Sequence, residues 1–249
     1  MKDKIYLGID IGGSGIKGAL VDVKTGELIT DRFRIPTPQP ATPEAVAEVI
    51  KEICKHFKWK DAVGCGYPGV VQNGVAKTAA NIDKAWINTD VEGLIKKMTG
   101  SPAKVLNDAD AAAIAEMKYG AGRKNRGLII TITIGTGVGV AMFTQKKLVP
   151  NCELGHILLP EFGEAEKWMS DGARKALKLE WNEWMERIDF YLKHLESLFY
   201  PDMIIIGGGL AKKLDPEKMP FTTQCQVVPA KLLNEAGIIG AAYAASKLE

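Results

Sequence analysis

Hydrophobic residues alternate with other residues over 5–11, and a glycine cluster at 12–15 follows directly. An extended pattern then resumes over 16–23 and ends in a turn at 24–27. A period of two is typical of a strand with one buried face. The first part of the chain is therefore predicted to form a strand, a glycine turn, a second strand and a further turn.

The same arrangement recurs in the middle of the chain. Residues 128–134 alternate, a glycine cluster at 135–139 interrupts, and 140–143 continues as a strand. A repeated hairpin, followed each time by alternating helices and strands, favours two related α/β lobes that face one another across a cleft. Chance repetition of glycine turns is the alternative that this pattern leaves open.

Periodicity and capping residues predict the remaining elements. Thr42-Pro43-Glu44 provides an N-cap and a proline at the first helical position, so a helix is expected over 44–57. Further helices are expected over 91–98, 108–119 and 234–247, and strands over 62–67, 103–106 and 203–206. We expect one lobe over 1–106, with the closing helix at 234–249 packed on it, and a second lobe over 107–233.

A run of large side chains in the second half recurs at helical spacing. It consists of Trp184, Ile188, Tyr191, Leu195 and Leu198. Such a stripe is the buried face of an amphipathic helix. These aromatic residues are therefore predicted to be core rather than a ligand site.

Composition narrows the class of protein. With 249 residues, 46% of them hydrophobic and 25% charged, the chain is typical of a globular protein with a sizeable core. A net charge of +2 does not fit a dedicated nucleic-acid binder, although a local basic groove is compatible with it. No stretch approaches the roughly 20 apolar residues of a membrane span, and the N-terminus has no signal-peptide core. We expect a cytoplasmic protein without nucleic-acid or membrane partners.

The four cysteines are scattered along the chain without a CxxC pair. They are Cys54, Cys65, Cys152 and Cys225. Reduced thiols of a cytosolic enzyme fit this spacing better than a disulfide framework or a zinc site.

Two common nucleotide motifs are excluded. Gly13, Gly15 and Gly18 match GxGxxG formally, but a dinucleotide site needs a helix after the glycines, and a strand follows here. Lys17 is followed by Gly18, so the spacing GxxxxGK[ST] of a P-loop is not met.

Three glycine clusters, at 12–15, 135–139 and 207–209, each end a hydrophobic strand. Backbone N–H groups in tight turns form concavities that bind anions, and bulky side chains would block them. Asp10 precedes the first cluster, and Ser14 and Thr136 supply a hydroxyl to each hairpin turn. Together these features favour phosphoryl transfer, with Asp10 holding a hydrated Mg²⁺. A turn-capping role is the alternative for Asp10.

Asn107 and Asp108 end one predicted strand and open a helix. Asp108 either caps that helix or acts as a general base on a substrate hydroxyl, with the amide of Asn107 orienting neighbouring hydroxyls. Asp110 points away from Asp108 on a helix and receives no catalytic role.

Glu153 and His156 form a further candidate pair. A lone histidine is more often structural, and no cysteine cluster completes a metal site here. The two side chains nevertheless offer an acceptor and a donor or acceptor to vicinal hydroxyls of a sugar.

The segments LGIDIGGSGIKGALVD, VLNDADAAAIAE, TITIGTGVGVAMF, ELGH and IIIGGG, in this order, resemble the ROK family of sugar kinases. GYPGVVQNGVAKTAANIDKAWINTD and VVPAKLLNEAGIIGAAYAA resemble the branch of that family that uses polyphosphate. The resemblance implies a two-lobed actin-like ATPase fold of the ribonuclease-H-like type, with a substrate cleft between the lobes. It also implies transfer of the terminal phosphate of inorganic polyphosphate, or of ATP in some members, to the 6-hydroxyl of glucose with Mg²⁺. A homodimer is implied in the same way.

The resemblance assigns roles to matching residues. Asp108 matches the catalytic base, and Asp10 belongs to the first phosphate loop. The sugar ligands implied are Asn107, Glu153 and His156, with Asn81, Gly69 and Glu166 as further candidates. The phosphate-binding residues implied are Gly12, Gly13, Ser14, Gly15, Lys17, Gly135, Thr136, Gly137, Gly207, Gly208 and Gly209.

The chain departs from the wider family at 157–175, where most ROK kinases carry a zinc-binding cysteine motif and this sequence has no cysteine. We expect no structural zinc, as in the polyphosphate branch. A helix-turn-helix typical of ROK repressors is also absent before the first strand, which argues against a DNA-binding repressor.

A polyanionic donor needs cations along its path. The candidates near the glycine loops are Lys17, Lys84, Arg123, Lys124, Arg126, Lys146, Lys147, Lys212 and Lys213. Most surface lysines are only solvated. The alternatives left open are a glucokinase or mannokinase that prefers ATP and, in another class, a catalytically silent sugar sensor or an actin-like filament protein.

Overall fold

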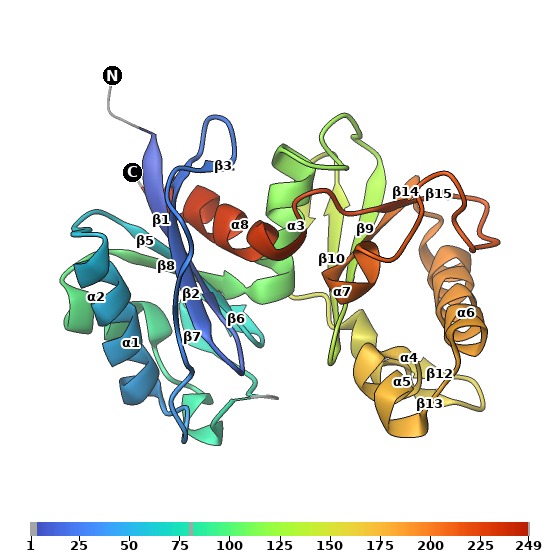
Figure 1. The fold of residues 1–249 in the computed structure, drawn as a ribbon, viewed down its shortest axis with the longest axis horizontal. Coiled ribbons are helices and arrows are strands. Elements are labelled where there is room, and N and C mark those ends of the chain that lie inside the picture. The colour runs from blue at the N-terminus through green and yellow to red at the C-terminus, as the bar shows by residue number, and fades with distance from the viewer. Residues whose placement is uncertain (1–3, 80–81, 249) are drawn as a thin grey trace. The chain divides into compact units, whose positions relative to one another are not determined.

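The computed structural model describes residues 4–79 and 82–248. The chain divides into two compact units, Met1–Tyr119 with Glu235–Glu249, and Gly120–Asn234. The boundary differs from the expected one at 106. Helix α3 (Asp108–Lys118) belongs to the first unit because it packs against α8 (Ala236–Ala245), beside which it lies in Figure 1.

The first unit is built on a mixed sheet with the order β3-β2-β1-β5-β8, and β4 pairs with β2. Its strands are β1 (Ile5–Ile11), β2 (Ile16–Asp22), β3 (Glu27–Leu28), β4 (Phe33–Ile35), β5 (Val63–Tyr67) and β8 (Ala103–Asn107). A small ribbon, β6 (Val71–Gln72) with β7 (Val75–Ala76), and a 3₁₀ turn, η1 (Lys84–Trp86), follow β5. The strand β1 is antiparallel to β2 and parallel to β5, which is parallel to β8.

Helices cover both faces of this sheet. The apolar core joins β1, β5 and β8 to α1 (Pro43–His56) and α2 (Val91–Thr99). In α1, Thr42 caps the first turn and Pro43 opens it, as predicted. The other face carries α8 and α3.

Glycines bring α8 unusually close to the sheet and to α3. A Cβ atom on Gly64 would lie 1.8 Å from the carbonyl oxygen of Ala241, and one on Gly8 would lie 2.0 Å from that of Ile238. A Cβ atom on Gly240 would lie 1.7 Å from the carbonyl oxygen of Ala111. These backbones therefore pack against one another without intervening side chains, which fixes the strand ends that carry the candidate site.

Gly64→Ala is expected to lower the free energy of unfolding by about 3 kcal/mol, because the clashing atom belongs to a helix backbone that cannot rotate away. Urea denaturation followed by circular dichroism measures this change. Gly209→Ala is the matched control, since a Cβ atom there meets no atom of the described residues within 4 Å. Equal midpoints for the two variants would contradict the close packing of α8.

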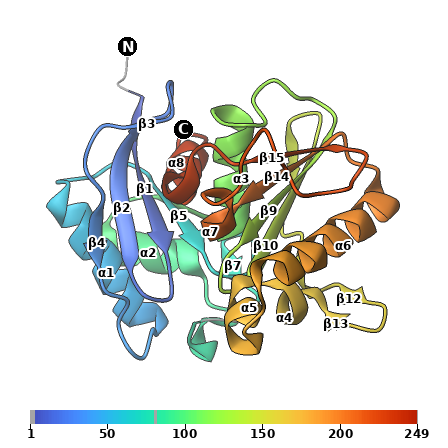
Figure 2. The ribbon, with the colours of Figure 1, turned by 45° about the vertical axis from the view of Figure 1, so that its right-hand side comes forward.

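The second unit has a sheet with the order β11-β10-β9-β14-β15. Its strands are β9 (Leu128–Ile134), β10 (Val138–Thr144), β11 (Lys147–Val149), β14 (Met203–Gly207) and β15 (Gln226–Pro229). The long helix α6 (Trp181–Phe199) packs on this sheet and shares its apolar core (Figure 2). The smaller elements are η2 (Leu154–His156), β12 (Leu158–Leu159), β13 (Gly163–Glu164), α4 (Ala165–Met169), α5 (Asp171–Leu177), α7 (Gly208–Ala211) and η3 (Leu233–Glu235).

The predicted hairpin repeat is confirmed. Both β1–β2 and β9–β10 are antiparallel pairs of seven-residue strands, closed by the glycine turns 12–15 and 135–137. The predicted core stripe on α6 is buried at Trp184, Ile188, Tyr191 and Leu195. The prediction is wrong at Leu198, whose side chain is 52% exposed near the end of the helix. No helix among residues 4–79 and 82–248 is long and apolar enough to cross a membrane.

Candidate functional site

The first glycine turn, 12–15, is held by side chains of β4 and of the segment that follows it. The guanidinium of Arg34 donates to the carbonyl oxygen of Ser14 at 2.6 Å, and the hydroxyl of Thr37 donates to that of Gly12 at 2.5 Å. A Cβ atom on Gly15 would lie 2.5 Å from Nε of Arg34, so a larger residue there would displace the guanidinium. Gly13 and Ser14 remain exposed at the tip of the turn, where an anion can reach their N–H groups.

Asp10 lies opposite Lys17 across the β1–β2 pair, and the Lys17 ammonium is 3.5 Å from the Asp10 carboxylate. Burial raises the pKa of Asp10, while the charges of Lys17 and Arg32 act in the opposite direction. The predicted phosphate ligand Lys17 is thus placed beside the first turn and paired with a carboxylate.

Asp10 is compatible with a magnesium site of the kind predicted. Among the described residues, no three His, Cys, Asp or Glu side chains gather to hold a metal ion. Mg²⁺ commonly uses one or two protein carboxylates and takes its other ligands from water and phosphate oxygens. A single carboxylate beside an anion-binding turn therefore fits this ion.

Asn107, rather than Asp108, caps helix α3. Its side-chain oxygen accepts hydrogen bonds from the N–H groups of Ala109 at 2.8 Å and Asp110 at 3.1 Å. Its amide nitrogen donates to the carbonyl oxygen of Gly69 at 3.2 Å, which joins two predicted site residues. Asp108 follows as the first helical residue, half-buried. Asn107 is thus the N-cap of α3, and Oδ1 of Asp108 also accepts the N–H of Ala109 at 2.8 Å.

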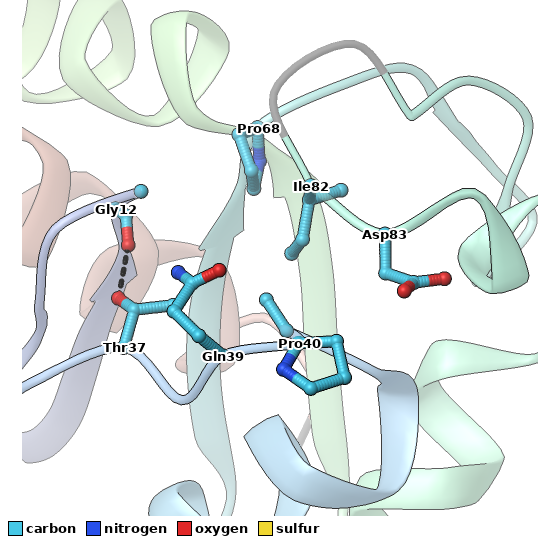
Figure 3. Close-up of a pocket in the computed structure, with 9 residues that line it drawn as sticks. Gly12, Thr37, Gln39, Pro40, Pro68, Ile82 and Asp83 are labelled. Carbon is cyan, nitrogen blue, oxygen red and sulfur yellow. Dashed lines mark hydrogen bonds between the residues drawn. The ribbon is translucent and has the colours of Figure 1, made fainter.

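A cavity of about 240 Å³ lies beside the first turn (Figure 3). It is lined by Gly12, Gly13, Thr37, Gln39, Pro40, Ala41, Pro68, Ile82 and Asp83. The hydroxyl of Thr37, the amide of Gln39 and the carboxylate of Asp83 lie among apolar walls. This combination suits a small polyhydroxylated ligand. Sequence analysis singled out the two glycines but none of the polar side chains that line this cavity. The predicted sugar ligand Asn81 lies outside the described residues.

In the second unit, the turn 135–137 is fixed by the segment around α4 and α5. The Glu166 carboxylate accepts the N–H of Val138 at 2.7 Å, and the carbonyl oxygen of Gly135 accepts the N–H of Asp171 at 2.9 Å. A Cβ atom on Gly137 would lie 2.5 Å from Oε2 of Glu166. Glu166, which was predicted as a sugar ligand, therefore anchors the turn 135–137.

The glycines 207–209 meet the turn 135–137 at one edge of the sheet. The strand β14 runs parallel to β9, and Gly208 forms a bridge with Ile134. Gly208 has a φ of 72° and sits so close to the carbonyl oxygen of Ile134 that a Cβ atom would lie 2.4 Å away. A side chain at this position is excluded both by conformation and by space.

Glu153 and His156 are brought together, with Nε2 of His156 3.5 Å from Glu153. The other ring nitrogen, Nδ1, contacts Glu164 of β13, a partner that the sequence did not indicate. Glu164 also pairs with Lys167 at 2.6 Å. Burial raises the pKa of Glu153, whereas the nearby His156 lowers it. The hydrogen bond with Glu164 is the main cause that raises the pKa of His156 above its usual value near 6.5.

Glu164→Gln is expected to lower the pKa of His156, because the neutral amide no longer stabilises the imidazolium. In the wild-type protein the raised pKa gives stabilisation that is fully present below the unfolded pKa and is lost as the pH rises through the folded one. An NMR titration of the His156 ring in both proteins measures the shift. Glu161→Gln, at an exposed carboxylate between β12 and β13, should leave the titration unchanged. The same midpoint in wild type and Glu164→Gln would show that Glu164 does not act on the ring.

The predicted cations fall into separate groups. Lys212 and Lys213 follow α7, separated from the third glycine cluster by two residues, and the ammonium of Lys213 lies 5.8 Å from the centroid of the Trp181 ring. Arg123, Lys124, Arg126, Lys146 and Lys147 lie at the other ends of β9 and β10, away from the turn 135–137. The expectation that these five adjoin a glycine loop is wrong, because each strand carries the chain across the whole sheet.

The model of the ROK family matches residues 6–172. This chain belongs to the ROK family. The match includes both hairpin turns and the Asn107–Asp108 pair. It therefore agrees with the motifs that indicated the family in the sequence.

Among ROK proteins, the chain is 45% identical over 240 residues to the polyphosphate glucokinase of Mycobacterium tuberculosis strain H37Rv, covering 95% of this chain and 89% of that one. It is 29% identical over 312 residues to the glucokinase of Streptomyces coelicolor, covering 96% of each. The structure of the inorganic polyphosphate/ATP-glucomannokinase from Arthrobacter sp. strain KM matches with a TM-score of 0.92 and 45% identity, over 98% of this chain and 99% of that one.

The structure of a ROK glucokinase from Streptomyces griseus in complex with glucose and AMPPNP matches with a TM-score of 0.81 and 26% identity, over 98% of this chain and 99% of that one. These matches confirm the predicted actin-like ATPase fold for this ROK chain.

Proposed function

We propose that this ROK protein is a polyphosphate-dependent glucokinase, which forms glucose 6-phosphate from glucose and inorganic polyphosphate and also accepts ATP. The observation that carries the proposal is the 45% identity, over 95% of the chain, to proteins named polyphosphate glucokinase. The glycine turns, Asp10 and Asp108 supply the chemical groups that such a transfer needs. The presence of these chemical groups also argues against a catalytically silent sugar sensor.

Asp108 acts as the general base. Its carboxylate takes the proton of the 6-hydroxyl as that oxygen forms a bond to the terminal phosphorus. The bond between that phosphorus and the bridging oxygen of the donor breaks, and the shortened polyphosphate, or ADP, leaves with the electron pair. Asn107 supports this role by capping α3 and by holding Gly69. Glu153, His156 and Glu166 are the proposed sugar ligands of the second unit.

In the first unit, the backbone N–H groups of the turn 12–15 are the proposed ligands of phosphate oxygens. In the second unit, this role is proposed for the turn 135–137 and for 207–209 with Lys212 and Lys213. Asp10 is the residue that would hold Mg²⁺, and the ion, when bound, would neutralise charge on the donor phosphates. The amide of Gln39 and the carboxylate of Asp83 place polar groups beside the first turn, where a sugar hydroxyl can bind.

A glucomannokinase is the second candidate, favoured by the TM-score of 0.92 to an enzyme of that name. The test incubates purified protein with Mg²⁺, a donor, and glucose or mannose, and identifies the products by mass spectrometry. Glucose 6-phosphate with polyphosphate supports the proposal, and mannose 6-phosphate at a comparable rate supports the second candidate. No phosphorylated sugar with either donor would contradict both.

Homodimer formation and a cytoplasmic location stay predictions. Light scattering after size-exclusion chromatography tests the first, since the chain mass is 27.0 kDa. A dimer is expected to give about twice this mass.

A further inference from the structure

Five exposed cations gather at one end of the second unit's sheet, which we call the basic end. They are Arg123, Lys124, Arg126, Lys146 and Lys147. Three lie in the loop before β9, and two lie at the turn between β10 and β11. Neither the glycine turns nor the candidate sugar ligands of this unit include any of them.

Strand register brings these two segments together. Leu128, the first residue of β9, pairs with Thr144, the last residue of β10, and Thr144 pairs with Lys147 of β11. The ammonium of Lys146 donates to the carbonyl oxygen of Arg123 at 2.8 Å and so ties the turn to the loop. The positive charges are therefore held at one place on the fold.

The two segments that form the basic end carry cations but no carboxylates. None of its cations forms an ion pair within the described part of the chain, whereas Lys104 and Lys175 pair with Glu92 and Asp171. The segments 120–128 and 144–152 contain no Asp or Glu. An acidic residue at this end, Asp202, accepts the N–H of Leu128 at 2.7 Å.

The turn between β10 and β11 gives a second indication. Gln145 and Lys146 both have positive φ, 49° and 64°. A two-residue turn of this kind favours asparagine or glycine, because other side chains crowd the backbone. Lys146 nevertheless occupies this position, and its ammonium binds the neighbouring loop at the carbonyl oxygen of Arg123.

We propose that the basic end binds the distal part of a long polyphosphate chain whose terminal part is at the turn 135–137 of the same unit. This inference rests on the proposed function. The seven residues of β9 separate the basic end from the turn 135–137, a span of roughly 20 Å. Only a long donor can contact both places, whereas ATP and tripolyphosphate are too short. Lysine and arginine pair with phosphate oxygens at every position of such a chain.

Polyphosphate fits this surface better than a nucleic acid does. Single-stranded nucleic acids are held by aromatic side chains that stack on bases as well as by cations. The segments 120–128 and 144–152 contain no Phe, Tyr or Trp. The two segments that form the basic end therefore supply cations for phosphate groups and no aromatic ring on which a base could stack.

The test compares wild type with the variant Arg123→Gln/Lys124→Gln/Arg126→Gln/Lys147→Gln. Lys146 is kept because its hydrogen bond to Arg123 holds the two segments together. The control variant changes four exposed lysines of the first unit to glutamine, Lys55, Lys60, Lys96 and Lys97. The readouts are KM and kcat with long-chain polyphosphate, tripolyphosphate and ATP, and direct binding of end-labelled long polyphosphate by fluorescence anisotropy.

We expect the basic-end variant to raise KM for long-chain polyphosphate about tenfold or more and to weaken its binding equally, with salt sensitivity reduced. Its kcat, and its KM for ATP and tripolyphosphate, should match those of wild type and the control. Unchanged binding and KM for the long chain would overturn the proposal. Equal losses of activity with all three donors would also overturn the proposal. So would binding of single-stranded RNA that is as tight as binding of polyphosphate and is weakened by the same variant. Failure of the proposed function would look different, because wild type would then turn over ATP but no polyphosphate.

Discussion

Asp108→Asn is expected to lower the turnover of glucose by a factor of about 10² to 10⁴, the range that a positioned general base contributes. The amide keeps the size of the side chain but cannot take the proton of the 6-hydroxyl. Asn107 continues to cap α3 through the N–H groups of Ala109 and Asp110, so the helix and the fold should be retained. Steady-state kinetics measures the loss, and calorimetric titration should show that glucose still binds.

The control for this substitution is Asp61→Asn, which removes an exposed carboxylate of the first unit. It should leave kcat unchanged. Near-normal turnover of Asp108→Asn, with an unaltered midpoint of thermal unfolding, would contradict the assignment of Asp108 as the general base. A loss of glucose binding as large as the loss of turnover would instead make Asp108 a sugar ligand.

The second large effect is expected for Asp10→Asn. A neutral amide is a poorer partner for a hydrated divalent cation than a carboxylate, and it leaves Lys17 without its charge partner. Turnover should fall by a factor on the order of 10², as it does when a group that stabilises transition-state charge is removed. The Mg²⁺ concentration that gives half-maximal turnover should rise, which kinetics over a series of Mg²⁺ concentrations measures.

Asp31→Asn, at an exposed position after β3, is the matched control and should leave the dependence on Mg²⁺ unchanged. A lower kcat at Asp10→Asn with the same Mg²⁺ dependence as wild type would mean that this carboxylate acts on the first turn through Lys17. In that case the assignment of Asp10 to the metal ion would be wrong.

The local elements of the fold could be predicted because each has a signal within a few residues. The period of two identifies β1 and β9, glycine clusters end them, and Thr42 with Pro43 opens α1. The unit boundary had no such signal. Helix α3 follows β8 without a break in the pattern, and its place in the first unit depends on Gly240, more than a hundred residues away in the chain.

In the candidate site, too, the residues with a local signal could be predicted and those placed by tertiary contacts could not. Asp10, Asp108 and the glycine turns stand out in the sequence because they end strands. Arg34 in β4 and Thr37 in the proline-rich segment after it support the first turn from about twenty residues later, and no periodicity links them to it. Glu164 reaches His156 only because the β12–β13 hairpin folds back, so its effect on that ring is a tertiary property.

The position of charges was the least predictable feature. Arg123 and Lys146 are close in sequence to the second glycine turn, but strands β9 and β10 carry them to the opposite end of the sheet. Sequence proximity to a loop does not imply proximity in space when a strand of seven residues intervenes. Because of this geometry, these cations form a separate surface and are not candidates for the site of phosphoryl transfer.

The central claim is that polyphosphate is a phosphoryl donor for glucose in this ROK protein. The most direct measurement is the ratio of kcat/KM with long-chain polyphosphate to kcat/KM with ATP, obtained with purified protein at fixed glucose and Mg²⁺. We expect glucose 6-phosphate from both donors and a ratio above one. Formation of glucose 6-phosphate with ATP alone would contradict the claim.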